Sequence, residues 1–251
     1  MFQGFYTLTS GVLTQNRNLN VISNNMANAT TPGFKSDRYI ISDFREEMIL
    51  RTGNKNKTNP ARIGTKSMII SGADVTTDYS QGGYSVTSGS LDFALGGNGF
   101  FCIQTDNGTV YTRNGNFSLD EEGYLCLPTV GRVLGTDGPI RLGTDRITAD
   151  RAGNLYSEDG EVLFGRLMVV DFQDYDTQLT KENGNVFRAT GNAVPVEVQI
   201  QWKALENSNA DPIDQMTRMM AGQRALQSSA QVMKMYDQLI SKMVSQLGPT
   251  A

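Results

Sequence analysis

Apolar side chains recur every three or four residues at both ends of this 251-residue chain, and a segment of different composition separates the two ends. At the N-terminus this stripe consists of Phe5, Leu8, Val12, Leu19, Ile22 and Met26. Near the C-terminus it consists of Met216, Met219, Leu226, Ala230, Met233, Ile240, Val244 and Leu247. Polar residues interrupt the stripes at Gln15, Gln223 and Asp237. The spacing predicts two long terminal helices that pair as a coiled-coil-like stem.

Turn-forming residues mark where these two helices begin and end. The first helix should stop near Asn28, because Pro32 keeps Thr31 out of the helical region and Gly33 permits a positive φ. The last helix should begin at Pro212, a residue suited to the first helical position, and run to about Leu247.

The outer faces of the terminal helices carry few charges. Arg17 is the one charged residue between Met1 and Phe34, so the first helix lacks the Glu and Lys side chains that solvate the outer face of an ordinary surface helix. The simplest interpretation is that both helices pack into the protein's own core. The uncharged faces favour neighbouring molecules instead, and we expect the termini to be mobile alone and to become ordered on association.

The middle of the chain has the regularly spaced turn residues that are typical of β-hairpins. Short Val, Ile, Phe and Tyr runs are separated by turns at Gly108, Gly115, Gly123, Gly138, Gly153 and Gly160. We expect a hairpin of residues 99–105 and 109–113, longer strands at 163–172 and 194–202, and a Greek-key sheet or small barrel. The expected fold is α+β: an N-terminal helix (1–30), a connector with short ordered pieces and an exposed loop (31–67), a central domain of short antiparallel strands (68–204) and a C-terminal helix (205–251).

Composition argues against several classes of function. The chain has no histidine, which removes the commonest general base and the preferred transition-metal ligand. Its net charge is −4 and it lacks a dense basic patch, which argues against nucleic acid and anionic membranes. No apolar run is long enough to span a bilayer, and the N-terminus does not read as a cleaved signal peptide. We expect no enzyme activity, no cofactor, no metal, no small-molecule substrate and no membrane insertion.

Three features leave other chemistry open. The Gly96–Gly99 loop leads into a strand, whereas phosphate-binding loops lead into a helix. The Asp120–Gly123 and Glu158–Glu161 clusters could supply carboxylates for a hydrolase or calcium ligands for a secreted adhesin, although Asp and Gly are also favoured in turns. Cys102 and Cys126 are either free thiols or one bridge between strands.

Three blocks of sequence resemble a known family. The first, Ile22–Lys35, carries the paired and turn-forming residues Asn24, Asn25, Ala27, Asn28, Thr31, Gly33, Phe34 and Lys35. The second covers Leu91–Phe101 and Tyr111–Arg113, and the third joins Leu205–Asn209 to Gln223 and Arg224. Together they resemble the flagellar axial proteins, specifically the basal-body rod proteins of the proximal and distal types. The segment Gly135–Ile140 is slightly more similar to the proximal type.

This resemblance implies a structural subunit of the bacterial flagellar basal-body rod. Such a subunit is exported by the flagellar type III apparatus without signal cleavage and polymerises outside the cytoplasmic membrane. The terminal helices would form a hollow axial tube by helical symmetry, with the β domain outside. The tube would transmit torque and pass later subunits, and its partners would be further copies and neighbouring rod and hook proteins. A hook or junction protein of the same family is the nearest alternative.

Overall fold

The computed structural model describes residues 2–51, 61–182 and 185–247, and its contacts divide the chain into two compact units. The helical unit contains Met1–Met26, Asp37–Thr76 and Pro212–Ala251. The β unit contains Ala27–Ser36 and Thr77–Asp211. This division differs from the four expected segments, because the short stretches that follow the first helix and precede the last one are bonded to the β unit.

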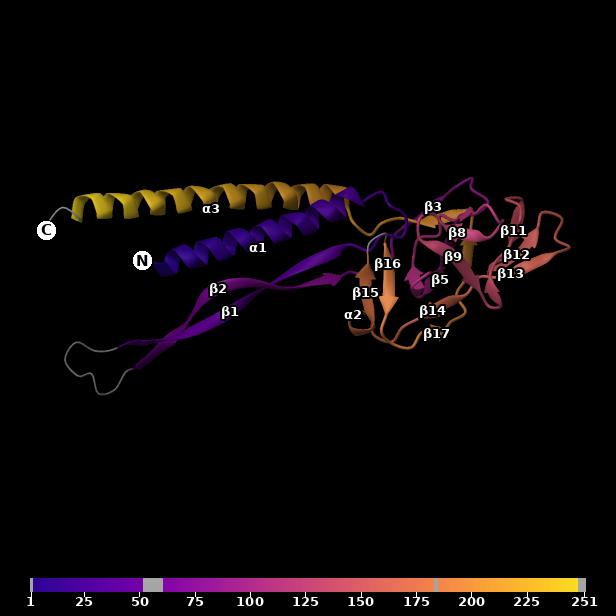
Figure 1. The fold of residues 1–251 in the computed structure, drawn as a ribbon, viewed down its shortest axis with the longest axis horizontal. Coiled ribbons are helices and arrows are strands. Elements are labelled where there is room, and N and C mark those ends of the chain that lie inside the picture. Colours follow the sequence, from indigo (N-terminus) through magenta and orange to yellow (C-terminus); the bar gives the residue numbers. More distant parts are fainter. Residues whose placement is uncertain (1, 52–60, 183–184, 248–251) are drawn as a thin grey trace. The chain divides into compact units, whose positions relative to one another are not determined.

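The two long helices of the helical unit have the expected bounds. Helix α1 is Phe2–Ala27 and helix α3 is Pro212–Leu247 (Figure 1). The turn at Thr31 begins directly after α1, where its amide donates to the Asn28 carbonyl at 3.1 Å. Within the described residues, no helix combines the length and hydropathy needed to cross a membrane.

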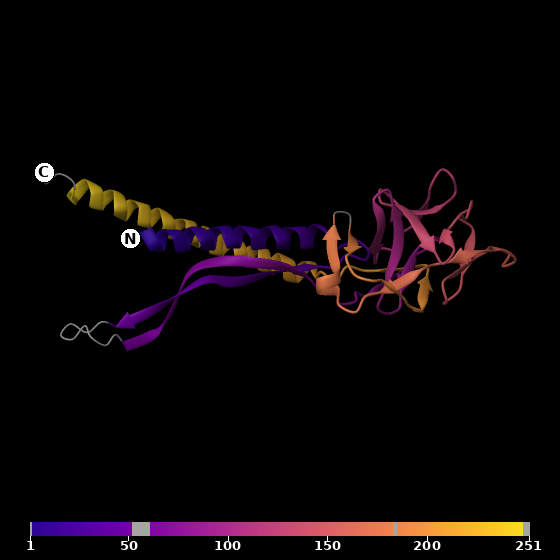
Figure 2. The ribbon, with the colours of Figure 1, turned by 60° about the horizontal axis from the view of Figure 1, so that its bottom comes forward.

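The connector expected at 31–67 instead contributes to two long strands. Strand β1 is Asp37–Arg51 and strand β2 is Ala61–Thr77, and together they form a two-stranded sheet (Figures 1 and 2). Ile40 and Ile41 are consecutive, so they point to opposite faces, yet they are 44% and 50% exposed. The sequences of β1 and β2 have no regular alternation of apolar and polar residues, which is why the sequence pattern did not reveal the ribbon. The exposed loop was expected at residues 51–62; residues 52–60 lie outside the described part of the chain, whereas Arg51 belongs to β1 and Ala61 and Arg62 to β2.

The β unit consists of short strands with one short helix, α2 (Tyr175–Gln178). Its strands are β3 (Tyr84–Val86), β4 (Phe93–Leu95), β5 (Phe100–Thr105), β6 (Gly108–Thr112), β7 (Ser118–Leu119), β8 (Leu125–Leu127), β9 (Gly131–Gly135), β10 (Gly138–Pro139), β11 (Ile147–Ala149), β12 (Asn154–Ser157), β13 (Leu163–Arg166), β14 (Val169–Asp171), β15 (Leu179–Glu182), β16 (Val186–Ala189), β17 (Val194–Pro195), β18 (Ile200–Trp202) and β19 (Ala204–Glu206). The main sheet runs β15-β16-β6-β5-β9-β8-β7, with β10 beside β9 and β14 beside both β5 and β17. This main sheet is therefore open and branched and does not close into a barrel, and the other described strands of the unit form the separate sheets β11-β12-β13, β4-β18 and β3-β19.

The expected hairpin is confirmed as β5 and β6, which pair from Phe101↔Thr112 to Thr105↔Gly108. The two longer strands expected from sequence are each divided. Residues 163–172 form β13 and β14, which belong to different sheets, and residues 194–202 form β17 and β18, likewise in different sheets. The first part of each segment is partly or fully exposed, with Leu163 57% and Val194 48% exposed, so the apolar residues did not mark where the chain changes sheets.

Strand β5 lies at the centre of the core. Its alternate residues enter two clusters, with Phe101 and Ile103 in one and Phe100 and Cys102 in the other. Gly115, expected in a turn, does not have a positive φ. A Cβ on Gly115 would lie 1.7 Å from the Phe93 carbonyl oxygen, so the glycine is required there by close backbone approach.

The alternative of a disulfide between the two cysteines is wrong, because both thiols are free. Arg132 of β9 is the register partner of both Cys126 and Gln104, so Cys126 lies two strands away from β5. Two strand spacings amount to about 9–10 Å, beyond the reach of a disulfide.

The two thiols should differ in reactivity. Burial raises the pKa of Cys102 to about 12, and its side chain is 2% exposed, so it is almost fully protonated at pH 8. We expect iodoacetamide at pH 8 to modify Cys126 in the native protein and to spare Cys102, as measured by peptide mass mapping. Both should react in denaturant. Equal labelling of Cys102 in the native state would contradict the packing of β5.

Candidate assembly site

The side chains of α3 that are covered lie in one regular stripe. Between residues 215 and 243 they are Gln215, Met219, Gly222, Leu226, Ser229, Met233, Tyr236 and Ile240. Steps of four and three alternate without interruption, which is the spacing of a helix seam. At alternate positions this seam runs one residue earlier than the expected stripe. The seam therefore does not include Gln223 and Asp237, and two of its positions are occupied by the small residues Gly222 and Ser229.

This seam is where α3 approaches α1. A Cβ on Gly222 would lie 2.7 Å from Leu19 Cδ2 and 2.9 Å from Gln15 Nε2. A Cβ on Gly4 would lie 3.2 Å from the Tyr236 hydroxyl. The early part of α1 therefore meets the late part of α3, so the two helices run antiparallel within the helical unit, as Figures 1 and 2 also show.

The residues expected to form the assembly interface are divided between covered and exposed positions. On α1, Leu8, Val12, Leu19 and Met26 are half-buried, Ile22 is buried and Phe5 is exposed. On α3, Met219, Leu226, Met233 and Ile240 lie in the seam, whereas Met216 and Ala230 are exposed. Gln223 and Arg224, expected from the third sequence block, are exposed as well. The side chains of Val244 and Leu247 lie outside the described part.

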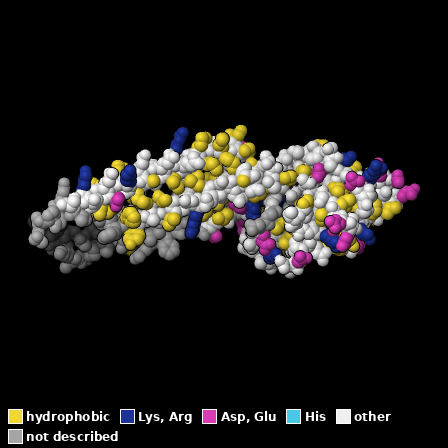
Figure 3. All heavy atoms as spheres, turned by 45° about the horizontal axis from the view of Figure 1, so that its top comes forward, with side chains coloured by type: hydrophobic (Ala, Val, Ile, Leu, Met, Phe, Trp, Pro, Cys, Tyr) yellow, Lys and Arg dark blue, Asp and Glu magenta, His cyan; other side chains and the backbone are white. Residues whose placement is uncertain are grey.

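A second set of apolar side chains on α3 is exposed. These are Ile213, Met216, Met220, Val232, Met235, Leu239 and Met243, between 40% and 76% exposed. We call them the outer stripe. On α1, Tyr6 and Leu13 are 65% and 61% exposed. Figure 3 shows hydrophobic side chains along the helical part, with few charged ones among them. Single exposed apolar residues are ordinary, but seven on one helix are typical of a contact surface. They form two groups, Ile213–Met220 and Val232–Met243, and the step of twelve residues between Met220 and Val232 places the groups on different sides of α3.

Asn25, from the first sequence block, joins three elements of the helical unit. Its Nδ2 donates to the Asp37 carbonyl at 2.7 Å, and its Oδ1 accepts from the Asp37 amide at 2.9 Å. Nδ2 also lies 3.5 Å from Gln215 Oε1 at the start of α3. Asn25 is 3% exposed, so these bonds are shielded from water. By contrast Asn24 and Ala27, expected from the same motif, are exposed.

A buried group of three charges lies in the β unit and joins all three sequence blocks. Lys35 Nζ lies 2.7 Å from Glu206 Oε1, and Arg113 Nη1 lies 3.4 Å from Glu206 Oε2. The three side chains are at most 3% exposed. Lys35 also donates to the Ser80 carbonyl, and Arg113 to the Gly97 carbonyl. We call Lys35, Arg113 and Glu206 the charge triad.

The triad holds two cations against one carboxylate. Burial lowers the pKa of Lys35, while the attraction of Glu206 opposes this change and the repulsion of Arg113 adds to it. Burial and the Glu206 charge also raise the pKa of the neighbouring Tyr84. Removing the carboxylate would leave two uncompensated buried positive charges, so the triad is stable only when complete.

The backbone beside Lys35 is held as closely as its side chain. The Gly33 amide donates to the Glu206 carbonyl at 2.7 Å, and Phe34 is 3% exposed. The Lys181 ammonium lies 4.1 Å from the Phe34 ring centre and donates to the Lys35 carbonyl at 2.5 Å. The earlier motif residues Asn28 and Thr31 bond to each other at 3.2 Å. These contacts fix the stretch that follows α1 onto the β unit.

Asn209 performs the same task for the stretch that precedes α3. Its Oδ1 accepts from the Ser36 amide at 2.7 Å. Its Nδ2 donates to the Asp78 carbonyl at 2.7 Å and approaches the Ser80 carbonyl at 3.2 Å. Residues 36, 78 and 209 stand at the places where the chain leaves or enters the β unit. The Asn209 side chain thus connects the stretches of chain that enter and leave the β unit.

Sequence reasoning found part of this arrangement. Lys35, Gly33 and Phe34 were expected from the motif, whereas Arg113 and Glu206 were noticed only as members of blocks. Lys181 was missed, because a lone lysine in a strand is indistinguishable from a surface residue. Asn209 was part of a block, and its signal was the turn-forming run that ends at Pro212.

The open chemical alternatives find no support among the described residues. These contain no group of three or more His, Cys, Asp or Glu side chains that could hold a metal. The Asp120 carboxylate accepts from the Glu122 and Tyr124 amides and pairs with Arg132 at 2.9 Å, so it supports a turn. Gly160, in the other cluster, has φ +73° and donates to the Ser157 carbonyl.

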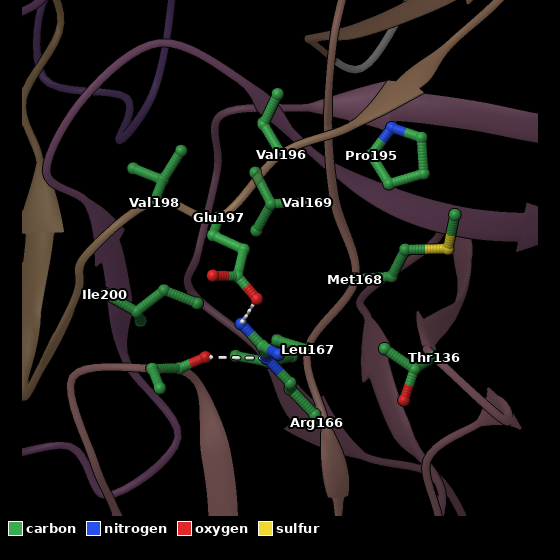
Figure 4. Close-up of a pocket in the computed structure, with 11 residues that line it drawn as sticks. Thr136, Arg166, Leu167, Met168, Val169, Pro195, Val196, Glu197, Val198 and Ile200 are labelled. Atoms are coloured by element: carbon green, nitrogen blue, oxygen red, sulfur yellow. Dashed lines mark hydrogen bonds and ion pairs between the residues drawn. The ribbon is translucent and has the colours of Figure 1, made fainter.

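Figure 4 shows a small pocket in the β unit. Val169, Val196 and Val198 contribute to its wall, and Arg166 pairs with Glu197 at 3.1 Å beside it. Its volume of about 140 Å³ is well below that of a typical ligand site, about 300–1,000 Å³. The charged side chains that line it, Arg166 and Glu197, form an ion pair with each other.

Comparison with known proteins decides the family. Residues 5–35 match the family model described as "Flagella basal body rod protein", 94–164 match "Flagellar hook protein FlgE/F/G D1 domain", and 203–247 match "Flagellar basal body rod FlgEFG protein C-terminal". The flagellar basal-body rod protein FlgG of Bacillus subtilis is 30% identical over 98% of this chain and 99% of its own length. The chain belongs to the flagellar basal-body rod protein family.

Other members give the same result. The basal-body rod protein FlgF of Mesorhizobium japonicum is 31% identical over 93% of both chains. FlgF of Caulobacter vibrioides is 29% identical over 99% of both chains. Rod proteins with both names are thus similar to this chain over nearly its whole length. The three matched regions each contribute one member of the charge triad, since Lys35, Arg113 and Glu206 fall in the first, second and third region.

Gly33, the one glycine of the Ile22–Lys35 motif, should not tolerate a side chain. A Cβ there would lie 2.4 Å from the Arg113 carbonyl carbon and the Asn114 nitrogen, at φ +65°. We expect Gly33→Ala to lower the free energy of unfolding by about 3 kcal/mol or more. Gly160→Ala is the control: it has φ +73° with open space around it and should cost about 1–2 kcal/mol. Urea unfolding measures both, and equal losses would contradict the close packing at Gly33.

Proposed function

We propose that this chain is a structural subunit of the bacterial flagellar basal-body rod and polymerises through its terminal helices into a hollow axial tube. The single observation that supports this best is the outer stripe of α3, seven apolar side chains on a helix of a rod-family protein. In this proposal the seam joins α1 to α3 as a coiled-coil-like stem within one subunit. The outer stripe contacts the next subunit, and residues 1–30 and 205–251 are the axial core.

The distribution of apolar surface favours an open polymer. The seam is used inside the helical unit, and the outer stripe is a different surface of the same helix. When the outer stripe of one copy packs against some other surface of the next copy, the contact is heterologous and does not have to close into a ring. Repetition of such a contact generates a helical filament, which suits a rod.

The other parts of the proposal follow from family membership. Export through the flagellar type III apparatus, location in the basal body outside the cytoplasmic membrane, torque transmission and contact with neighbouring rod and hook proteins are proposed for this chain as for a rod subunit. A rod role is favoured over a hook or junction role, because the relatives described above carry rod names. A structural rather than catalytic role is supported in the same way.

Charge placed on the outer stripe should block assembly without unfolding the subunit. Leu239 is 60% exposed, so Leu239→Glu should leave the thermal unfolding temperature and helix content nearly unchanged. Burying that carboxylate between subunits is unfavourable, and we expect the assembled fraction to fall about tenfold or more. The matched control is Gln238→Glu, an exposed polar neighbour.

Both variants would be expressed in a motile host that lacks its own copy of the subunit. Rods in purified basal bodies would be counted by electron microscopy, and swimming would be scored in soft agar. Wild-type numbers of rods with Leu239→Glu would show that the outer stripe is not an assembly surface.

A further inference from the structure

The last part of the β unit to be synthesised completes its core. Strand β18 pairs with β4, from Ile200↔Leu95 to Trp202↔Phe93, and β19 pairs with β3, from Ala204↔Val86 to Glu206↔Tyr84. Ile200 is 2% exposed and belongs to the main core cluster. The strands β3 and β4 are therefore paired only when a segment from the far end of the unit arrives. We call residues 200–211 the closing segment.

Most of the remaining pairing in the β unit is local. Strands β5 and β6, β7 and β8, β8 and β9, β11 and β12, and β15 and β16 are neighbours in sequence and in the sheets. Strand β5 also pairs with β9 and β14, and β6 with β16, over intermediate separations. The closing segment bridges the longest ones, since Glu206 lies 171 residues from Lys35 and 93 from Arg113. Local hairpins form quickly, whereas contacts over such separations pay a larger loop-closure entropy.

Electrostatics add a second reason for late closure. Lys35 and Arg113 reach their buried positions as cations, and the Glu206 carboxylate is the counter-charge that both contact. A β unit without Glu206 would have to exclude water from two positive charges at once, which is strongly unfavourable. The surrounding groups do not replace it, because Lys181 is also a cation and Asp78 and Tyr84 contribute weaker interactions.

We propose that Glu206 is the folding latch of the β unit: its docking between Lys35 and Arg113 is part of the rate-limiting step. A chain delivered N-terminus first, as every chain is during synthesis, keeps this unit open until residue 206 is available. The latch thus couples completion of the β unit to arrival of the stretch that leads into α3. This goes beyond the role of the chain in a rod and does not depend on it.

The closing segment carries its own probe. Trp202 is the one tryptophan of the chain, and its Nε1 donates to the Ser90 carbonyl at 2.8 Å. Stopped-flow fluorescence of the full-length protein after dilution from urea therefore reports docking of this segment. We expect Glu206→Gln to slow refolding about tenfold or more at pH 7. Glu197→Gln, whose side chain is 85% exposed beside Arg166, is the matched control and should refold at the wild-type rate.

The pH dependence separates a charge effect from loss of shape. Burial lowers the pKa of Lys35, so the folded chain releases this proton at a lower pH than the unfolded chain does. Raising the pH through that range removes one uncompensated charge and favours the folded state. In Glu206→Gln the refolding rate should recover part of its loss between pH 7 and pH 10. Lys35→Met in the Glu206→Gln background should recover most of it at pH 7.

Two kinetic results would overturn the latch. One is Glu206→Gln refolding within twofold of wild type and only unfolding faster, because Glu206 would then dock after the rate-limiting step. The other is an equal slowing by Glu197→Gln. If Glu206→Gln does not fold at pH 7, the double variant decides: the proposal expects it to fold, and failure of the double variant contradicts the charge argument.

Discussion

A buried carboxylate shared by two cations is the interaction on which the β unit depends. Glu206 is fully shielded from water between Lys35 and Arg113. Such a group is a poor source of net stability, because desolvation offsets most of the attraction. The triad instead makes the fold specific. Each cation can be buried only beside the Glu206 carboxylate, and replacing Glu206 by an apolar residue, without also replacing the cations, would leave both of them unpaired. The triad therefore fixes which three stretches of chain must meet.

Local signals made the helices and the first hairpin predictable. The Pro and Gly residues that end α1 and the Pro212 that begins α3 act within a few residues, so their effects are visible in sequence. The register of the seam was harder to predict from the sequence. Gly222 and Ser229 occupy covered positions without an apolar signal, and this shifted the expected stripe at alternate positions. The sequences of β1 and β2 lack a regular apolar alternation, so the ribbon gave no period-two signal.

The candidate site was predictable where it coincided with turn chemistry. Gly33 and Asn25 stood out in a recognisable run, whereas the meaning of Glu206 depends on residues far away in sequence. A buried ion pair leaves no periodic pattern, since each charged residue alone resembles a solvated one. The two units have different roles. The β unit is closed by charges within itself, and the helical unit presents an outer apolar stripe that we assign to contacts between subunits.

A double-mutant cycle between Lys35 and Glu206 tests the central claim most directly. The free energy of unfolding would be measured by urea titration for the wild type, Lys35→Met, Glu206→Gln and the double variant. If the triad holds the β unit together as a set, Glu206→Gln alone costs about 3–5 kcal/mol and the double variant recovers much of that loss. Additive losses, with a coupling energy below about 0.5 kcal/mol, would contradict it.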